Sequence, residues 1–181
     1  MRLAVVVPVF NEAAAIESTL ARLASLRARG ARVIVVDGGS TDATAVLSKA
    51  HADRVLQSER GRAQQMNAGA RAAIDDGADV LLFVHADSAL PESADRLIET
   101  SLRTSGRAWG RFDVRIDGQA PMLSVVSAMM NWRSRLTGIC TGDQGIFVTR
   151  STFERLAGFA PIALMEDVEF SKRAKGLSWP A

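Results

Sequence analysis

The sequence predicts a single α/β domain in which a mostly parallel sheet is flanked by helices. Short runs rich in valine and leucine alternate, along the first part of the chain, with amphipathic stretches of helical length. This alternation is typical of a parallel sheet covered by helices on both faces. The chain has 181 residues, of which 48% are hydrophobic and 23% charged. It can therefore bury a substantial core, and disorder is excluded as its main state.

Four apolar runs in the first half predict buried parallel strands, at residues 3–7, 32–36, 54–56 and 80–84. Helices are expected at residues 13–29, from about 41 to 50, and at 63–75 and 91–103. Gly30 is a natural stop for the first helix, and Pro91 suits the first turn of the fourth. Ser40 or Thr41 is a candidate cap for the second.

The second half of the chain is less regular. Phe112, Val114 and Ile116 alternate with charged residues, which predicts a half-exposed strand over residues 112–117. The other elements expected there are a helix at residues 122–136, a strand at 145–148, and short helices at 151–156 and 167–175. We therefore divide the single domain, residues 1–181, into halves at residues 1–105 and 106–181.

Composition and charge exclude several classes of protein. Lys and Arg number 22 against 20 Asp and Glu, and the arginines are scattered, so no nucleic-acid surface is expected. Cys140 is the one cysteine, which excludes an internal disulfide and a cysteine-based zinc site and fits a reducing compartment. No apolar run reaches the roughly 20 residues that span a bilayer. The N-terminus lacks a signal-peptide pattern, so we expect a cytoplasmic protein.

Polar residues and glycines follow three of the predicted strands. They are residues 8–12 (PVFNE), 37–40 (DGGS) and 85–87 (HAD). Ligands of open parallel sheets bind at the carboxyl ends of the strands, so the sequence predicts a binding site there. A dinucleotide-binding turn is disfavoured because residues 8–12 contain no glycine. A phosphate-binding P-loop is excluded because Gly-Lys-Ser and Gly-Lys-Thr do not occur.

Four motifs follow one another along the chain, at residues 5–12 (VVVPVFNE), 35–42 (VVDGGSTD), 85–87 (HAD) and 166–167 (ED). In this order they resemble the signature of family 2 glycosyltransferases, which have the Rossmann-like GT-A fold. The resemblance extends through residues 142–145 (GDQG) and covers nearly the whole chain. Each motif alone is modest, whereas the ordered set is specific. Within the superfamily the chain most resembles the bacterial branch known as rSAM/selenodomain-associated transferase 2.

The resemblance implies that residues 1–105 bind a nucleoside-diphosphate sugar. Pro8, Phe10 and Glu12 would form the floor and rim of the base pocket, although Asn11 and Glu12 also suit a helix cap. Asp37 would accept hydrogen bonds from the base or ribose.

Other residues complete the implied donor site. Gly38 would allow close backbone approach, or simply form a tight turn, and Ala86 belongs to the same site. Relatives carry an arginine where this chain has residues 65–67 (QMN). Arg62 or Arg60 would supply that charge, with a solvated arginine as the alternative.

The resemblance also implies a divalent cation, Mn²⁺ or Mg²⁺. Asp87 stands where the family places the last acid of its Asp-x-Asp motif, and His85 replaces the first. Hard cations prefer carboxylate oxygen, and histidine suits Mn²⁺ better than Mg²⁺. We expect Asp87 to be the direct protein ligand; a helix cap beside Ser88 is the alternative. His85 would touch the sugar or orient the loop.

Residues 106–181 would bind the acceptor and carry the catalytic base. In inverting transfer a carboxylate removes the proton of the acceptor hydroxyl. By the resemblance Asp167 is this base and Glu166 its neighbour, although both residues also suit a helix cap. Asp143 and Gln144 would meet sugar hydroxyls.

The expected function is metal-dependent, inverting transfer of a sugar to an unidentified hydroxyl acceptor. The alternative is a catalytically impaired nucleotide-sugar-binding module, because relatives continue for several tens of residues past the Glu-Asp motif. A nucleotidyltransferase is disfavoured because its glycine-rich basic loop is absent. Two partners are left open: a second copy of the chain, and a membrane surface contacted by the helix at residues 122–136, for which core packing is the alternative.

Overall fold

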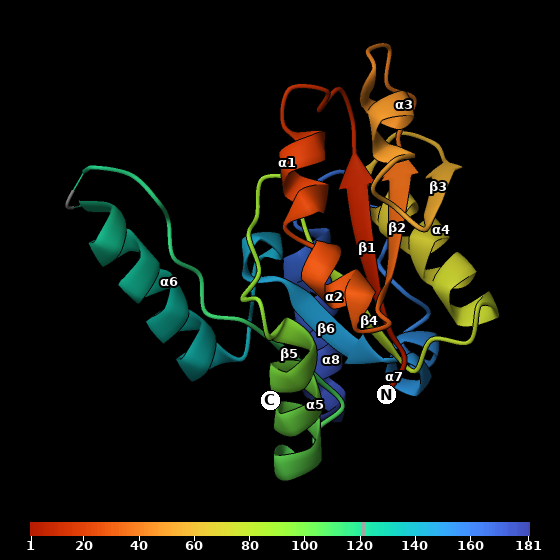
Figure 1. The fold of residues 1–181 in the computed structure, drawn as a ribbon. Coiled ribbons are helices and arrows are strands. Elements are labelled where there is room, and N and C mark those ends of the chain that lie inside the picture. Colours follow the sequence, from red (N-terminus) through yellow and green to blue (C-terminus); the bar gives the residue numbers. More distant parts are fainter. Residues whose placement is uncertain (121) are drawn as a thin grey trace.

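A computed structural model describes residues 1–120 and 122–181 of the chain. It contains one six-stranded sheet between two layers of helices, with α6 set apart at one side (Figure 1). The predicted α/β class and mostly parallel sheet are confirmed.

The sheet has the strand order β3-β2-β1-β4-β6-β5. Its strands are β1 (Leu3–Val9), β2 (Arg32–Asp37), β3 (Arg54–Gln57), β4 (Val80–Phe83), β5 (Trp109–Arg111) and β6 (Ile146–Thr149). The pairings β3–β2, β2–β1 and β1–β4 are parallel, whereas β6 is antiparallel to both β4 and β5. The four parallel strands are the four predicted from the first half of the chain.

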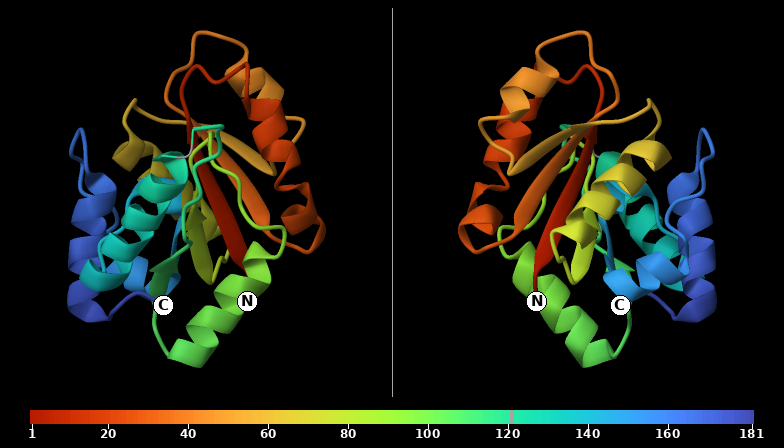
Figure 2. Two further views of the ribbon diagram at one scale, coloured as in Figure 1. Left: turned by 90° about the vertical axis from the view of Figure 1, so that its left-hand side faces the viewer. Right: turned by 90° about the vertical axis from the view of Figure 1, so that its right-hand side faces the viewer.

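The helices cover both faces of this sheet (Figure 2). They are α1 (Ile16–Ala21), α2 (Ala24–Ala28), α3 (Thr44–Ser48), α4 (Arg62–Asp75), α5 (Ala94–Ser105), α6 (Met122–Thr137), α7 (Arg150–Arg155) and α8 (Glu166–Leu177). One core cluster includes Ile16, Leu26 and Ile98 from α1, α2 and α5. The opposite cluster includes residues of α4, α7 and α8. Since both faces are covered, the central strands β1 and β4 are apolar and buried along their whole length rather than alternating.

Strand β1 pairs over different lengths with its two neighbours. Pairing with β2 continues to Val9 opposite Asp37, whereas pairing with β4 ends at Val6 opposite Phe83. The N–H of Val84 donates to the carbonyl of Val6 at 3.1 Å. The next residue of β1 that faces β4 is Pro8, which has no N–H to extend the ladder. A crevice between diverging strand ends is where open α/β sheets bind ligands.

Three predicted helices differ in extent. The helix expected at residues 13–29 is divided into α1 and α2, and the residue that precedes α1 is Ala15. Neither Asn11 nor Glu12 therefore caps it. The helix expected after Ser40 begins only at Thr44, behind Ala43, without a side-chain cap. The helix expected from Pro91 begins at Ala94.

The strand predicted at residues 112–117 is wrong. Only residues 109–111 pair, as β5 with β6. The backbone beyond them bonds to α6 instead: the Asn131 side chain exchanges two hydrogen bonds with Val114, at 2.8 and 2.9 Å, and Ser127 Oγ accepts from Ile116 N at 2.9 Å. Side chains of a helix thus take the place of a neighbouring strand.

Over residues 1–120 and 122–181, none of the helices is long and apolar enough to cross a membrane.

Gly69 lets α4 approach the sheet closely. A Cβ at this position would lie 2.4 Å from Val6 Cγ1 and 2.9 Å from Val36 Cγ2, whereas one at Gly176 in α8 would meet nothing within 4 Å. Gly69→Ala is expected to lower the free energy of unfolding by about 1–3 kcal/mol through overpacking. Gly176→Ala is the matched control and should raise it by about 0.5 kcal/mol through helix propensity. Urea unfolding measures both, and equal effects would contradict this packing.

Candidate active site

The loop after β1 is joined to the loop after β2 by side-chain hydrogen bonds. Ser40 Oγ accepts from Asn11 N at 2.8 Å, and Asn11 Oδ1 accepts from Thr41 N at 2.9 Å. Asn11 has a φ of 54°, a left-handed conformation that asparagine tolerates better than most residues. Asn11 therefore joins two loops instead of capping a helix.

A second set of bonds lies one step further along the same loops. Thr44 Oγ1 accepts from Glu12 N at 2.7 Å, and Asp42 Oδ2 accepts from Ala13 N at 3.1 Å. Asp42 Oδ1 also accepts from Thr44 N at 3.0 Å. The Thr44 hydroxyl donates to the same oxygen at 2.5 Å. The hydrogen bonds that Asp42 accepts, that of the Thr44 hydroxyl above all, lower the pKa of Asp42 below its usual range.

Asp37 lies at the end of β2 and is fully buried. Its carboxylate accepts bonds from the backbone N–H of Ser40, at 3.1 and 3.2 Å, and from the Ser40 hydroxyl. A base or ribose would reach this carboxylate only if the loop at Ser40 opened.

Gln65 reaches from α4 to the ends of β1 and β2. Its Nε2 donates to Val9 O and Val36 O, both at 2.8 Å, and the side chain is buried. A Cβ at Gly38 would lie 3.1 Å from the Gln65 amide, which explains the glycine there. Gln65 thus fixes the spacing of the strand ends from which Phe10 and Asp37 emerge.

Two arginines lie over this side of the site. The Arg60 guanidinium is 4.1 Å from the centroid of the half-buried Phe10 ring, a cation–π contact. Arg62 is exposed at the start of α4. Pro8 is buried within β1, and Glu12 is half-buried in the loop beyond it.

The end of β4 meets two segments of the second half of the chain. His85 Nδ1 is 3.5 Å from Asp143 Oδ1, and a Cβ at Gly142 would lie 2.3 Å from His85 Cε1. The backbone N–H of Gly142 donates to Asp167 Oδ2 at 2.5 Å, and that of Val168 to Oδ1 at 2.7 Å. His85, Asp143 and Asp167 are therefore brought together.

Residues from both halves of the chain affect the pKa of Asp143. The contact with His85 lowers the pKa of Asp143, which burial opposes and the positive charge of Arg62 supports. Cys140 is buried beside the cluster, and burial raises the pKa of its thiol to about 12, so it stays protonated and unreactive.

The other predicted site residues lie around this cluster. Asp87 is exposed, with Ser88 Oγ at 3.4 Å, and begins no helix. Ala86 is buried, and its carbonyl accepts from the Thr19 hydroxyl at 2.5 Å. Glu166 is buried at the start of α8. Gln144 is only 1% exposed and forms a capping box with Thr141, so the structure does not bring its side chain to open surface.

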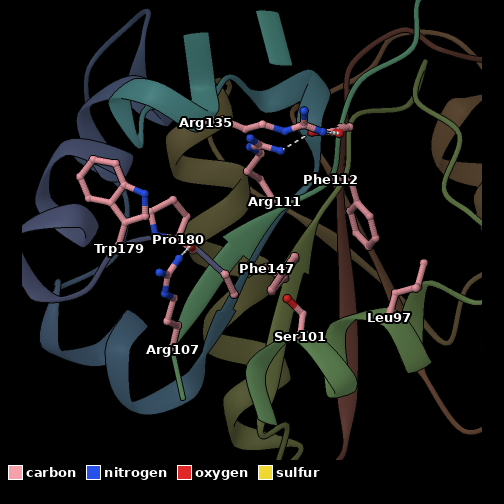
Figure 3. Close-up of a pocket in the computed structure, with 11 residues that line it drawn as sticks. Leu97, Ser101, Arg107, Arg111, Phe112, Arg135, Phe147, Trp179 and Pro180 are labelled. Atoms are coloured by element: carbon pink, nitrogen blue, oxygen red, sulfur yellow. Dashed lines mark hydrogen bonds and ion pairs between the residues drawn. The ribbon is translucent and has the colours of Figure 1, made fainter. Parts of the chain in front are cut away.

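A hollow of about 520 Å³ lies elsewhere, against β5 (Figure 3). Its lining includes Arg107, Arg111, Phe112 and Trp179, and none of the predicted site residues. Asp113 contacts both Arg111 and Arg135, and Arg107 donates to the carbonyl of Pro180. These guanidinium groups already have partners within the protein.

The chain matches the family described as glycosyl transferase family 2 over residues 4–150. It belongs to that family. It is also 36% identical, over 107 residues, to the succinoglycan biosynthesis protein ExoA of Rhizobium meliloti (strain 1021). That match covers 55% of this chain and 32% of ExoA, so the chain spans about a third of this curated relative.

Solved structures share the fold at lower identity. The mannosyltransferase PcManGT from Pyrobaculum calidifontis, in complex with GDP-Man and Mn²⁺, has a TM-score of 0.76 and 22% identity, over 99% of this chain and 53% of that one. S. aureus TarS 1–349 in complex with UDP-GlcNAc has a TM-score of 0.75 and 19% identity, over 96% and 53%. Together with the family match, this similarity confirms the predicted GT-A fold.

Asp42 should make stability depend on pH. Its pKa is lowered by folding, so its contribution is complete above the unfolded-state pKa of about 4 and is lost as the pH falls through the folded-state value. Asp42→Asn should therefore be less stable than the parent chain at pH 7, and the difference should shrink near pH 3. Urea unfolding of the parent chain and of Asp42→Asn at pH 7 and pH 3 measures the difference in free energy of unfolding. A difference that is the same at both pH values would contradict this role of Asp42.

Proposed function

We propose that this chain is a glycosyltransferase domain that moves a sugar from a nucleoside-diphosphate donor to a hydroxyl acceptor. Family membership supports the reaction class. The observation that carries the assignment is the meeting of His85, Asp143 and Asp167 at the end of β4, beside the point where β1 and β4 separate. Three segments distant in sequence thus supply polar groups to one edge of the sheet.

Residues 1–105 form the donor half in this proposal. Phe10 offers a flat face to the base, with Pro8 and Glu12 at the floor and rim, and Arg60 would move aside or stack on the nucleotide. Asp37 and Gly38 would meet the base or ribose after opening at Ser40. Arg62 and Ala86 would lie along the diphosphate, where the guanidinium offers a positive charge.

A divalent cation, Mn²⁺ or Mg²⁺, fits this site as an ion shared with the donor. No group of three or more His, Cys, Asp or Glu side chains in the described parts of the chain is placed to hold a metal alone. Asp87 is an exposed oxygen ligand with one weak contact, which suits a cation that takes its other ligands from phosphate and water. A bound cation would offset charge on the departing diphosphate.

Residues 106–181 form the acceptor half, with Asp167 as the general base. Its carboxylate oxygens are oriented by Gly142 N and Val168 N. Asp167 would take the acceptor hydroxyl proton while that oxygen bonds to the anomeric carbon and the bond to the diphosphate breaks. Asp143 and His85 would contact sugar hydroxyls, and buried Glu166 and Gln144 would support the loops. A single displacement of this kind inverts the anomeric centre.

The remaining assignments rest on the motifs alone. We propose on that basis the rSAM/selenodomain-associated transferase 2 branch, an unidentified hydroxyl acceptor and a cytoplasmic location. A homodimer is a further proposal without a contact to support it.

Asp167→Asn should abolish transfer while donor binding is kept. Removing a general base lowers kcat by about 10²- to 10⁴-fold, whereas the amide keeps the size of the side chain and one of the two backbone hydrogen bonds that the carboxylate accepts. The measurement is nucleotide release with a donor that binds, alongside the donor dissociation constant. Glu154→Gln, an exposed carboxylate on α7, is the matched control. Parental kcat in Asp167→Asn would refute the assignment of the base.

Asp87→Ala should remove metal-dependent donor binding. The parent chain is first screened by thermal shift with UDP-, GDP-, dTDP- and CDP-sugars and Mn²⁺ or Mg²⁺, because a ligand specific for the native state raises Tm. The effective donor should then give a much smaller shift with Asp87→Ala, while Asp117→Ala, at an exposed position, behaves as the parent. An unchanged shift would refute Asp87 as the ligand, and no shift with any donor would contradict the proposed function.

A further inference from the structure

Helix α6 turns its hydrogen-bonding side chains toward the protein and six of its large apolar residues outward. The inward residues Ser127, Asn131 and Ser134 hydrogen-bond to Ile116, Val114 and Arg111. The outward side, which we call the outer face, consists of Met122, Val125, Val126, Met129, Trp132 and Leu136. All six are exposed, Trp132 by 66% and Met129 by 64%. A surface helix of a globular protein normally has the opposite arrangement.

The position of α6 leaves this face accessible. The helix stands to one side of the sheet in Figure 1 and lies along the near side of the left view of Figure 2. Its 16 residues span about 24 Å. A contiguous exposed apolar surface of this kind marks an interaction site.

The charge on α6 indicates what covers the outer face. Arg133 is exposed, lies at helical spacing from Met129 and Leu136, and has no ion-pair partner among the described residues. The helix contains no Asp or Glu. If a second copy docked its own α6 on this face, Arg133 would be enclosed against a helix that has no carboxylate, which is unfavourable. A lipid surface would supply phosphates, and the long side chain can extend to them while its neighbours are buried.

We propose that the outer face of α6 docks on an anionic lipid bilayer, with the helix lying in the plane of the interface. Met129 and Trp132 enter the boundary between headgroups and acyl chains, and Arg133 pairs with lipid phosphate. An amphipathic helix that combines apolar area with positive charge binds membranes in this way. This inference does not depend on the proposed transfer reaction.

Vesicle co-sedimentation of the full chain tests it. We expect binding to vesicles of phosphatidylcholine mixed with phosphatidylglycerol, weaker binding to phosphatidylcholine alone, and loss at high salt. Met129→Glu/Trp132→Glu should lower partitioning at least about tenfold, and Arg133→Gln about fivefold on the anionic vesicles only. Val46→Glu is the matched control, an equally exposed apolar residue on α3. Circular dichroism and Tm should be unchanged in all variants.

Fluorescence gives an independent measurement. Trp109 is buried and Trp179 lies outside α6, so a blue shift on vesicle addition should vanish in Trp132→Phe and persist in Trp179→Phe. The proposal is overturned if the parent chain binds neither vesicle, or if the double Glu variant binds as the parent does. It is also overturned if sedimentation velocity finds a dimer that the double variant dissociates while vesicles are not bound.

Discussion

The missing N–H of Pro8 is the local feature on which the arrangement of the site depends. Pro8 lies in β1 just beyond the last hydrogen bond to the β4 side, which Val84 N donates to Val6 O, and it occupies the position that would continue this pairing. Pairing with β2 continues to Val9, so the end of β1 is hydrogen-bonded on the side of β2 and unpaired on the side of β4. The chain after β4 can then turn toward residues 142–143 and 167 instead of extending the sheet. One absent donor thus ends the pairing of β1 with β4 at the carboxyl edge, where open α/β sheets bind ligands.

Side-chain hydrogen bonds, rather than further strand pairing, hold the loops at this edge of the sheet. Gln65 bonds to carbonyls of both β1 and β2, and Asn11 and Ser40 join the two loops beyond them. On the other side Asp167 is held by the backbone of Gly142. A satisfied network of this kind holds the loops in one arrangement, so the contact proposed between Asp37 and a donor would require Ser40 to leave the Asp37 carboxylate.

Local pattern predicted the parallel half of the fold and the places where polar groups gather, because buried strands and their ends are properties of short segments. It could not predict partners distant in sequence, such as Asn11 with Thr41 or Gln65 with Val9. Gln65 left one usable signal, a polar residue among the small apolar residues on the inward side of α4. Residues 112–117 alternate as a strand does, yet their hydrogen bonds go to Asn131 and Ser127, which a two-residue period cannot reveal.

The same bonds explain why α6 is apolar on its outward side. The backbone at Val114 and Ile116 has no strand beside it, and unpaired backbone groups are costly to bury. Asn131 and Ser127 satisfy them, which commits the inward side of the helix to polar residues. The six large apolar residues of the outer face therefore point outward, where they gain little from the protein core. A lipid surface would stabilise such a face by supplying apolar contact along its length and an anion near Arg133, as proposed above.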